Sequence, residues 1–211
     1  MPGTLSILLL QGDAEARLLA DAELALQLVF PGREVQLSRA WMPRPDWLAS
    51  DTAAEQVRIA RDLLEQPQRL VILTLLPAVT VRAGTVQAPL CPRDAASALE
   101  PIIEHLQQRG TVVALTTAFR HLSEPLQHRQ TGAPPSLREL VRRTNFEVAR
   151  LSHRTGCFVL DLDRALAEIG GGTLGTDCFG GAGQGAELAV EELVALIADA
   201  LPDELEPVDP L

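Results

Sequence analysis

Four side chains in this sequence have types and positions that covalent catalysis could use. Asp177 and Cys178 are adjacent, shortly before the last stretch of helical periodicity, and a cysteine near a helix N-terminus can have a lowered pKa. Asp13 follows the first apolar run of the chain, and His121 follows the fourth. A nucleophile beside a histidine and a carboxylate is a common arrangement for attack on a carbonyl carbon. The sequence fixes no histidine near Cys178, so a buried or simply exposed thiol is the alternative interpretation.

Three arginines follow apolar runs that have strand character: Arg39, Arg82 and Arg120. Guanidinium groups bind carboxylate or phosphate through two parallel hydrogen bonds, so these arginines could clamp an anion. Pairing with the carboxylates of the chain itself is the other interpretation, because 28 acidic residues accompany 18 basic ones. The full set of candidate ligand-binding residues is Gly12, Asp13, Arg39, Arg82, Arg120, His121, Asp177 and Cys178.

The composition excludes several mechanisms. All 18 basic residues of the 211-residue chain are arginines, so a lysine Schiff base, a P-loop lysine and the lysine of a protein kinase are impossible. The formal net charge of -10 repels phosphate, so we expect no general nucleic-acid surface. Small neutral or acidic molecules and protein partners remain open.

No metal or cofactor is expected. The three cysteines, Cys91, Cys157 and Cys178, form no CxxC pair, which argues against a zinc cage and a disulfide framework. We expect reduced thiols, at least two of them buried. The four histidines lack metal-ligand spacing, and two lie on expected helix exteriors. No GxGxxG loop follows a strand, so a dinucleotide site is not indicated.

The N-terminus lacks a basic region, and its first apolar run, 5–10, is far shorter than the ~20 residues that span a bilayer. We therefore expect a cytoplasmic protein without membrane contact.

Apolar periodicity alternates between short strand-like runs and longer helical ones, which is typical of a parallel sheet with crossover helices. Near-continuous apolar content in the runs indicates strands covered on both faces. Gly110 lies where a helix C-cap is expected. The expected strands are 5–10, 34–38, 70–76, 111–117 and 157–161, and the expected helices are 15–30, 52–65, 95–109, 137–154 and 186–201.

Two helices show a clear apolar face that should pack on the sheet. The face of 15–30 contains Leu18, Ala22, Leu26 and Val29. The face of 137–154 contains Leu137, Leu140, Val141, Thr144, Val148 and Leu151.

The chain should form one domain over residues 1–201, followed by an acidic flexible tail at 202–211. Long loops are expected at 121–136 and 170–185. Ligands of parallel α/β sheets collect beyond the carboxyl ends of the strands. That edge should display Asp13, Arg39, Val79, Arg82, Arg120, His121 and Asp163.

Three stretches resemble the SGNH/GDSL hydrolase superfamily. LLQGDA at 9–14 is similar to the first family motif, DCFG at 177–180 has the spacing of the last one, and 145–163 resembles the helix and fifth strand between them. The resemblance covers about residues 4–201. It implies an α/β fold, a three-layer α/β/α sandwich around a flavodoxin-like five-stranded parallel sheet, with a serine nucleophile and a histidine base.

The sequence departs from the family at the residues that carry its chemistry. Ala14 stands at the nucleophile position and Gly180 at the position of the base. Ala78 stands where the family has an asparagine donor, and the second strand is followed by no glycine for the other donor. Gly12, Asp13 and Asp177 persist, although capping alone favours an aspartate at a helix start.

The leading hypothesis is therefore a catalytically degenerate SGNH-like protein, a ligand-binding or accessory subunit in a bacterial biosynthetic or polysaccharide-modification pathway. The alternative is a divergent esterase or acyltransferase that has moved its chemistry to Asp13, His121, Asp177 or Cys178. A third hypothesis is a structural partner of another protein that binds through the segment from Trp41 to Trp47.

Overall fold

The structure is a computed structural model that describes residues 4–11, 16, 18–42, 55–75, 80–82, 85–87, 91–118, 137–168 and 184–202. Side chains are described for these residues except 55–58, 80–82, 85–87 and 137–138. The expected tail and both expected long loops lie largely or wholly outside these ranges.

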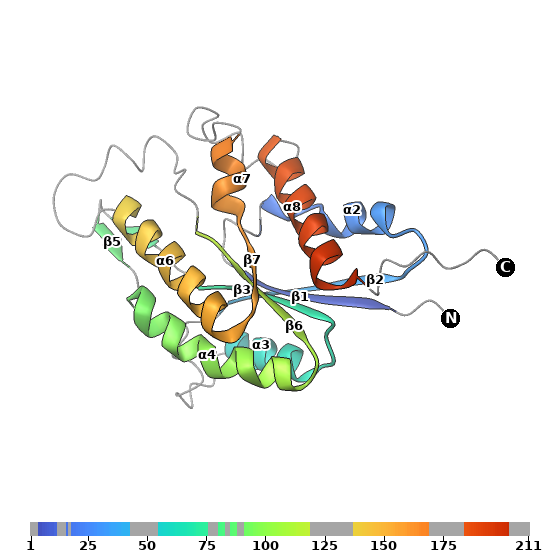
Figure 1. The fold of residues 1–211 in the computed structure, drawn as a ribbon, viewed down its shortest axis with the longest axis horizontal. Coiled ribbons are helices and arrows are strands. Elements are labelled where there is room, and N and C mark those ends of the chain that lie inside the picture. Colours follow the sequence, from blue (N-terminus) through green and yellow to red (C-terminus); the bar gives the residue numbers. More distant parts are fainter. Residues whose placement is uncertain are drawn as a thin grey trace.

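The centre of the fold is a parallel sheet with the strand order β2-β1-β3-β6-β7 (Figure 1). Its strands are β1 (Leu5–Gln11), β2 (Val35–Trp41), β3 (Leu70–Thr74), β6 (Val112–Thr116) and β7 (Phe158–Leu160). Every neighbouring pair is parallel. The five-stranded flavodoxin-like sheet expected from the sequence is confirmed.

Helices cover both faces of the sheet and give the expected three layers. Side chains from α3 (Glu55–Glu65), α4 (Pro92–Gln108) and α6 (Leu137–Thr155) form one hydrophobic cluster with the sheet. Side chains from α2 (Ala22–Val29), α7 (Leu162–Glu168) and α8 (Gln184–Ala200) contribute to the cluster on the other face. Successive side chains of β1 point to opposite faces of the sheet and so separate the two clusters. Leu8 and Leu10 belong to the first cluster, and Ile7 and Leu9 belong to the second.

The strand boundaries differ from the prediction at two places that carried candidate residues. The expected strand 34–38 extends to Trp41, so Arg39 lies inside β2 rather than in the following loop. An antiparallel hairpin of β4 (Thr80–Arg82) and β5 (Thr85–Gln87) was not predicted, and it places Arg82 in a strand.

The first expected helix is also wrong in part. A turn at 19–21 precedes α2. Leu18, Ala22 and Leu26 are buried as predicted, but Val29 is 49% exposed and Phe30 is buried instead. On α6 the prediction is confirmed for Leu140, Val141, Thr144, Val148 and Leu151, which are all buried.

Gly110 has a φ of +79°, which L-residues with a side chain rarely adopt, so the predicted glycine after α4 is confirmed. Gly156 has a φ of +71° after α6, and its N–H donates to the carbonyl of Ser152 at 2.8 Å. Both glycines let a helix end directly before a strand of the sheet.

The two described cysteines differ in exposure: Cys91 is exposed and Cys157 is buried, and both are free thiols. Cys178 lies outside the described residues, so the expectation of two buried thiols stays a prediction. Burial raises the pKa of the Cys157 thiol above its usual value.

Iodoacetamide at about pH 8 should modify Cys91 at least about tenfold faster than Cys157, because Cys157 is buried and because burial raises its pKa and so disfavours the reactive thiolate. Peptide mapping by mass spectrometry would measure both rates in one sample. In denaturant the two rates should converge. Equal rates in the native protein would contradict the described burial of Cys157.

Within the described ranges, no helix has the length and apolar character needed to cross a membrane.

Candidate functional site

Most residues singled out in the sequence lie outside the described part of the chain: Gly12, Asp13, Ala14, Val79, Arg120, His121, Asp177, Cys178 and Gly180. Arg82 is described by its backbone only. The structure therefore does not test whether the catalytic candidates Asp13, His121, Asp177 and Cys178 converge.

Arg39 is the described member of the proposed anion clamp. It lies on β2 in register with Leu9, and its guanidinium donates to the backbone carbonyl of Ala20 at 2.9 Å. Part of its hydrogen-bonding capacity therefore ties β2 to the turn before α2.

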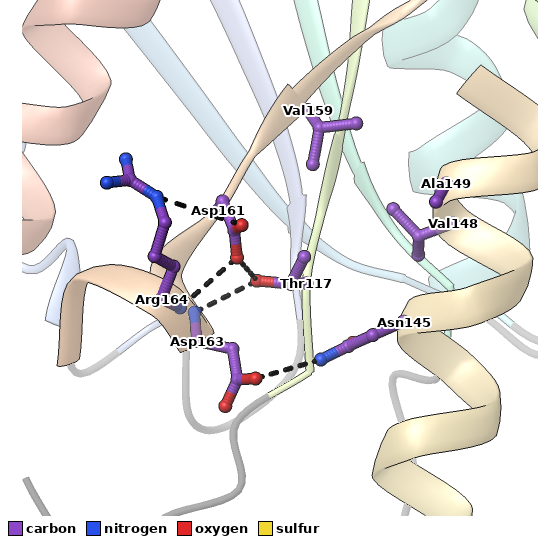
Figure 2. A pocket seen from close by; sticks show the side chains of 8 residues that line it. All are labelled: Thr117, Asn145, Val148, Ala149, Val159, Asp161, Asp163 and Arg164. Carbon is purple, nitrogen blue, oxygen red and sulfur yellow. Dashed lines mark hydrogen bonds and ion pairs between the residues drawn. The ribbon is translucent and has the colours of Figure 1, made fainter. Parts of the chain in front are cut away.

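A second group of polar residues meets in a pocket of about 200 Å³ at the carboxyl ends of β6 and β7 (Figure 2). Its polar part contains Thr117, Asn145, Asp161, Asp163 and Arg164. Val148, Ala149 and Val159 form the apolar wall. The pocket is smaller than the ~300–1,000 Å³ typical of small-molecule sites.

Thr117 is the hydrogen-bonding centre of this pocket. Its hydroxyl donates to Oδ1 of Asp161 at 3.0 Å and accepts from the backbone N–H of Asp163 at 2.9 Å. The same Oδ1 atom accepts from the N–H of Arg164 at 3.2 Å, which is the bond of a helix N-cap. Asp161 thus begins α7, and Thr117 connects that start to the end of β6.

Asn145 connects α6 to the same corner. Its Oδ1 accepts from the N–H of Ala118 at 2.8 Å, and its Nδ2 donates to the carbonyl of Ala118 at 2.9 Å. Nδ2 also donates to Oδ2 of Asp163 at 3.2 Å. Asp163 is 5% exposed, so this amide helps to satisfy a buried carboxylate.

Arg164 lies among acidic side chains at the rim of the pocket. Its Nη1 is 2.8 Å from Glu168, its Nη2 is 3.4 Å from Glu192, and its Nε is 3.9 Å from Asp161. Glu168 belongs to α7 and Glu192 to α8, so Arg164 joins two helices of one layer. Because its side chain is 56% exposed, each of these ion pairs contributes little to stability.

The arrangement of the described residues suits positioning and binding rather than nucleophilic chemistry. The hydroxyl of Thr117 donates to a carboxylate and also accepts a backbone N–H, and none of the described residues that line the pocket is a histidine. Among the described residues, the contact of Asp161 Oδ2 is a long one, 3.9 Å from Nε of Arg164, and the Asp161 side chain is 41% exposed. A donor group on a ligand could reach that oxygen.

Among the described residues, no group of three or more His, Cys, Asp or Glu side chains is arranged to hold a metal ion.

The sequence predicted Asp163 at this edge of the sheet, and the structure places it there, inside a helix that was not predicted. Thr117, Asn145, Asp161 and Arg164 were missed as a group. The available signal was Asp161 directly after an apolar run, with Leu162, Ala165 and Leu166 at helical spacing.

These features define a three-layer α/β/α protein with the strand order of flavodoxin-like sheets. No family model matches the sequence, and no curated protein matches it. Several solved structures have a similar fold.

A protein from Slackia heliotrinireducens assigned to the SGNH hydrolases is 14% identical with a TM-score of 0.59, covering 91% of this chain and 98% of that one. A variant of an acetyl xylan esterase from Geobacillus stearothermophilus is 14% identical with a TM-score of 0.62, over 92% and 95% of the two chains. A lipase/acylhydrolase from Enterococcus faecalis is 16% identical with a TM-score of 0.59, over 94% and 96%. At these identities the likeness establishes the fold, which is that of the SGNH hydrolases.

Proposed function

We propose that this chain is a non-hydrolytic protein on the SGNH hydrolase fold, which acts as a ligand-binding or accessory subunit. The observation that carries the proposal is the sequence Gly12-Asp13-Ala14 directly after β1. In proteins of this family the third position holds the nucleophilic serine, whereas alanine has no oxygen with which to attack. Gly180 at the position of the base supports the same conclusion.

The size of the expected rate loss indicates that activity is lost rather than merely weakened. Removing one member of a serine triad costs several orders of magnitude in rate, and the residual catalysis comes from the oxyanion hole and binding. Here the family's asparagine donor is also replaced, by Ala78. The described pocket at β6 and β7 offers no substitute pair, because Thr117 is engaged by Asp161 and Asp163.

The names of solved structures with a similar fold suggest which class of ligand to propose. Two of them are named acetyl xylan esterase and lipase/acylhydrolase, so acylated sugars and acyl esters are the first ligands to test. We place the protein in a polysaccharide-modification or biosynthetic pathway of a bacterial cytoplasm, where it binds such a molecule or a partner enzyme without cleaving the ester.

Purified protein should hydrolyse p-nitrophenyl acetate and butyrate no faster than the Ala14→Gly variant, and a fluorophosphonate probe should label neither. An active esterase of the same fold serves as the positive control. Turnover that a single substitution, Cys178→Ser or Asp177→Asn, abolishes would overturn the proposal in favour of the divergent esterase or acyltransferase.

A further inference from the structure

Gln11 carries a buried polar atom that the fold does not satisfy. The residue ends β1 and is 9% exposed. Its side-chain oxygen Oε1 is buried and accepts no hydrogen bond within the described part of the chain. A buried acceptor without a donor destabilises a folded protein, so such groups are rare and commonly have another role.

The position of Gln11 in the sheet is the position at which α/β proteins bind ligands. β1 has β2 on one side and β3 on the other, so the strand order reverses direction at β1. In doubly wound sheets of this order, ligands bind beyond the carboxyl ends of the strands in the crevice between β1 and β3, which the end of β1 borders. Gln11 is the last residue of β1, directly before Gly12.

An aromatic residue of β2, Trp41, lies beside Gln11 in the sheet. The two residues are Cα partners in the parallel register of β1 and β2. Residues paired in this way point to the same face of a sheet, and both continue the face of Leu9 and Leu37. Trp41 is 47% exposed, so a large apolar ring lies open to solvent next to the unsatisfied amide.

We infer that Gln11 and Trp41 form a binding subsite for a neutral sugar ring, which stacks on the indole while one of its hydroxyls donates to Oε1 of Gln11. An amide oxygen is an acceptor and requires a donor group on the ligand. The apolar C–H face of a sugar ring suits the flat indole.

The oxygen is buried in the free protein, so a sugar hydroxyl reaches it after the side chain has turned toward the open surface beside Trp41. The sugar hydroxyl then takes the place of the water that would hydrate Oε1 at the surface. This subsite deepens the proposed function, on which it rests, by naming the class of ligand.

Gln68 provides a matched control. It precedes β3, at the amino end of the sheet, and is 8% exposed. Its Oε1 is likewise buried and has no hydrogen-bond partner among the described residues. Gln11→Met and Gln68→Met therefore remove the same kind of unsatisfied atom from opposite ends of the sheet.

Both variants should raise Tm by roughly 2–4 °C, because methionine fills a similar volume without a buried acceptor. Titration calorimetry and tryptophan fluorescence would then measure binding of xylotetraose, cellotetraose, mannotetraose and chitotetraose. At least one sugar should bind the wild type, and its Kd should rise about tenfold or more in Gln11→Met and in Trp41→Ala. Gln68→Met should keep the wild-type Kd.

Three results would each overturn the subsite. One is the absence of binding by all four sugars up to about 10 mM, which is the weak end of specific affinity. Another is an equal Kd for Gln11→Met and Gln68→Met. The third is choline binding at Trp41 more tightly than every sugar, which would make the subsite one for organic cations. None of these results depends on ester turnover, so failure of the subsite is distinct from failure of the proposed function.

Discussion

The Leu73→Ala variant is expected to unfold with a free energy about 2–5 kcal/mol lower than that of the native protein. Leu73 is 1% exposed in the middle of the sheet, where β3 pairs with β1 on one side and β6 on the other. Its side chain belongs to the cluster under α3, α4 and α6. The rigid backbone of two neighbouring strands limits collapse around the cavity, which favours the upper half of that range.

Leu28→Ala is the matched control, because it deletes the same atoms from a side chain that is 74% exposed on α2. Its expected effect is within about 0.5 kcal/mol, since alanine is a better helix former and little burial is lost. Chemical denaturation followed by circular dichroism measures both variants. A loss for Leu73→Ala as small as that for Leu28→Ala would mean that the described core is not the one that folds.

The part of the fold that the sequence predicted well is the buried centre. β1, β3 and β6 are near-continuous apolar runs because both of their faces are covered, and their predicted bounds agree with the structure to within two residues at either end. The bounds of the edge strand β2 were harder to predict. Arg39 was interpreted as a loop residue, but at the edge its side chain can leave the sheet and donate to Ala20.

The apolar face of the first helix was predicted incorrectly at its last position. The positions Leu18, Ala22 and Leu26 have helical spacing, and the next step of four residues is Phe30, not Val29. The turn at 19–21 cannot be recognised from spacing alone, since it leaves the apolar residues on one face.

The polar corner of the site could not be predicted because it depends on three separate segments. Thr117 meets Asp161 because β6 and β7 are neighbours, a fact of strand order that short motifs do not encode. Asn145 reaches Ala118 because α6 packs over the end of β6. The family resemblance includes the segment 145–163, which contains Asn145, Asp161 and Asp163, but it did not indicate the hydrogen bonds that join these residues to the end of β6.

Replacing Asn145 by alanine should lower the free energy of unfolding by about 2–3 kcal/mol, which is the second large effect expected after that of Leu73→Ala. The substitution removes all three hydrogen bonds of the amide. It leaves the N–H and carbonyl of Ala118 without this partner and weakens the support of the buried Asp163 carboxylate. Phe146→Ala is the control on the next residue, which is 62% exposed with Arg150 stacked 5.8 Å from its ring centre. That loss should stay below about 1 kcal/mol.

A double-mutant cycle with Thr117→Val tests whether the corner acts as one unit. Asn145 holds the side chain of Asp163 and Thr117 holds its backbone N–H, so the two residues share a partner at the start of α7. Once either contact is lost, the first turn of α7 can shift and the second contact contributes less. The combined loss should therefore fall short of the sum by about 0.5 kcal/mol or more. Strict additivity, or an Asn145→Ala loss no larger than that of Phe146→Ala, would show that the pocket residues do not hold β6, α6 and α7 together.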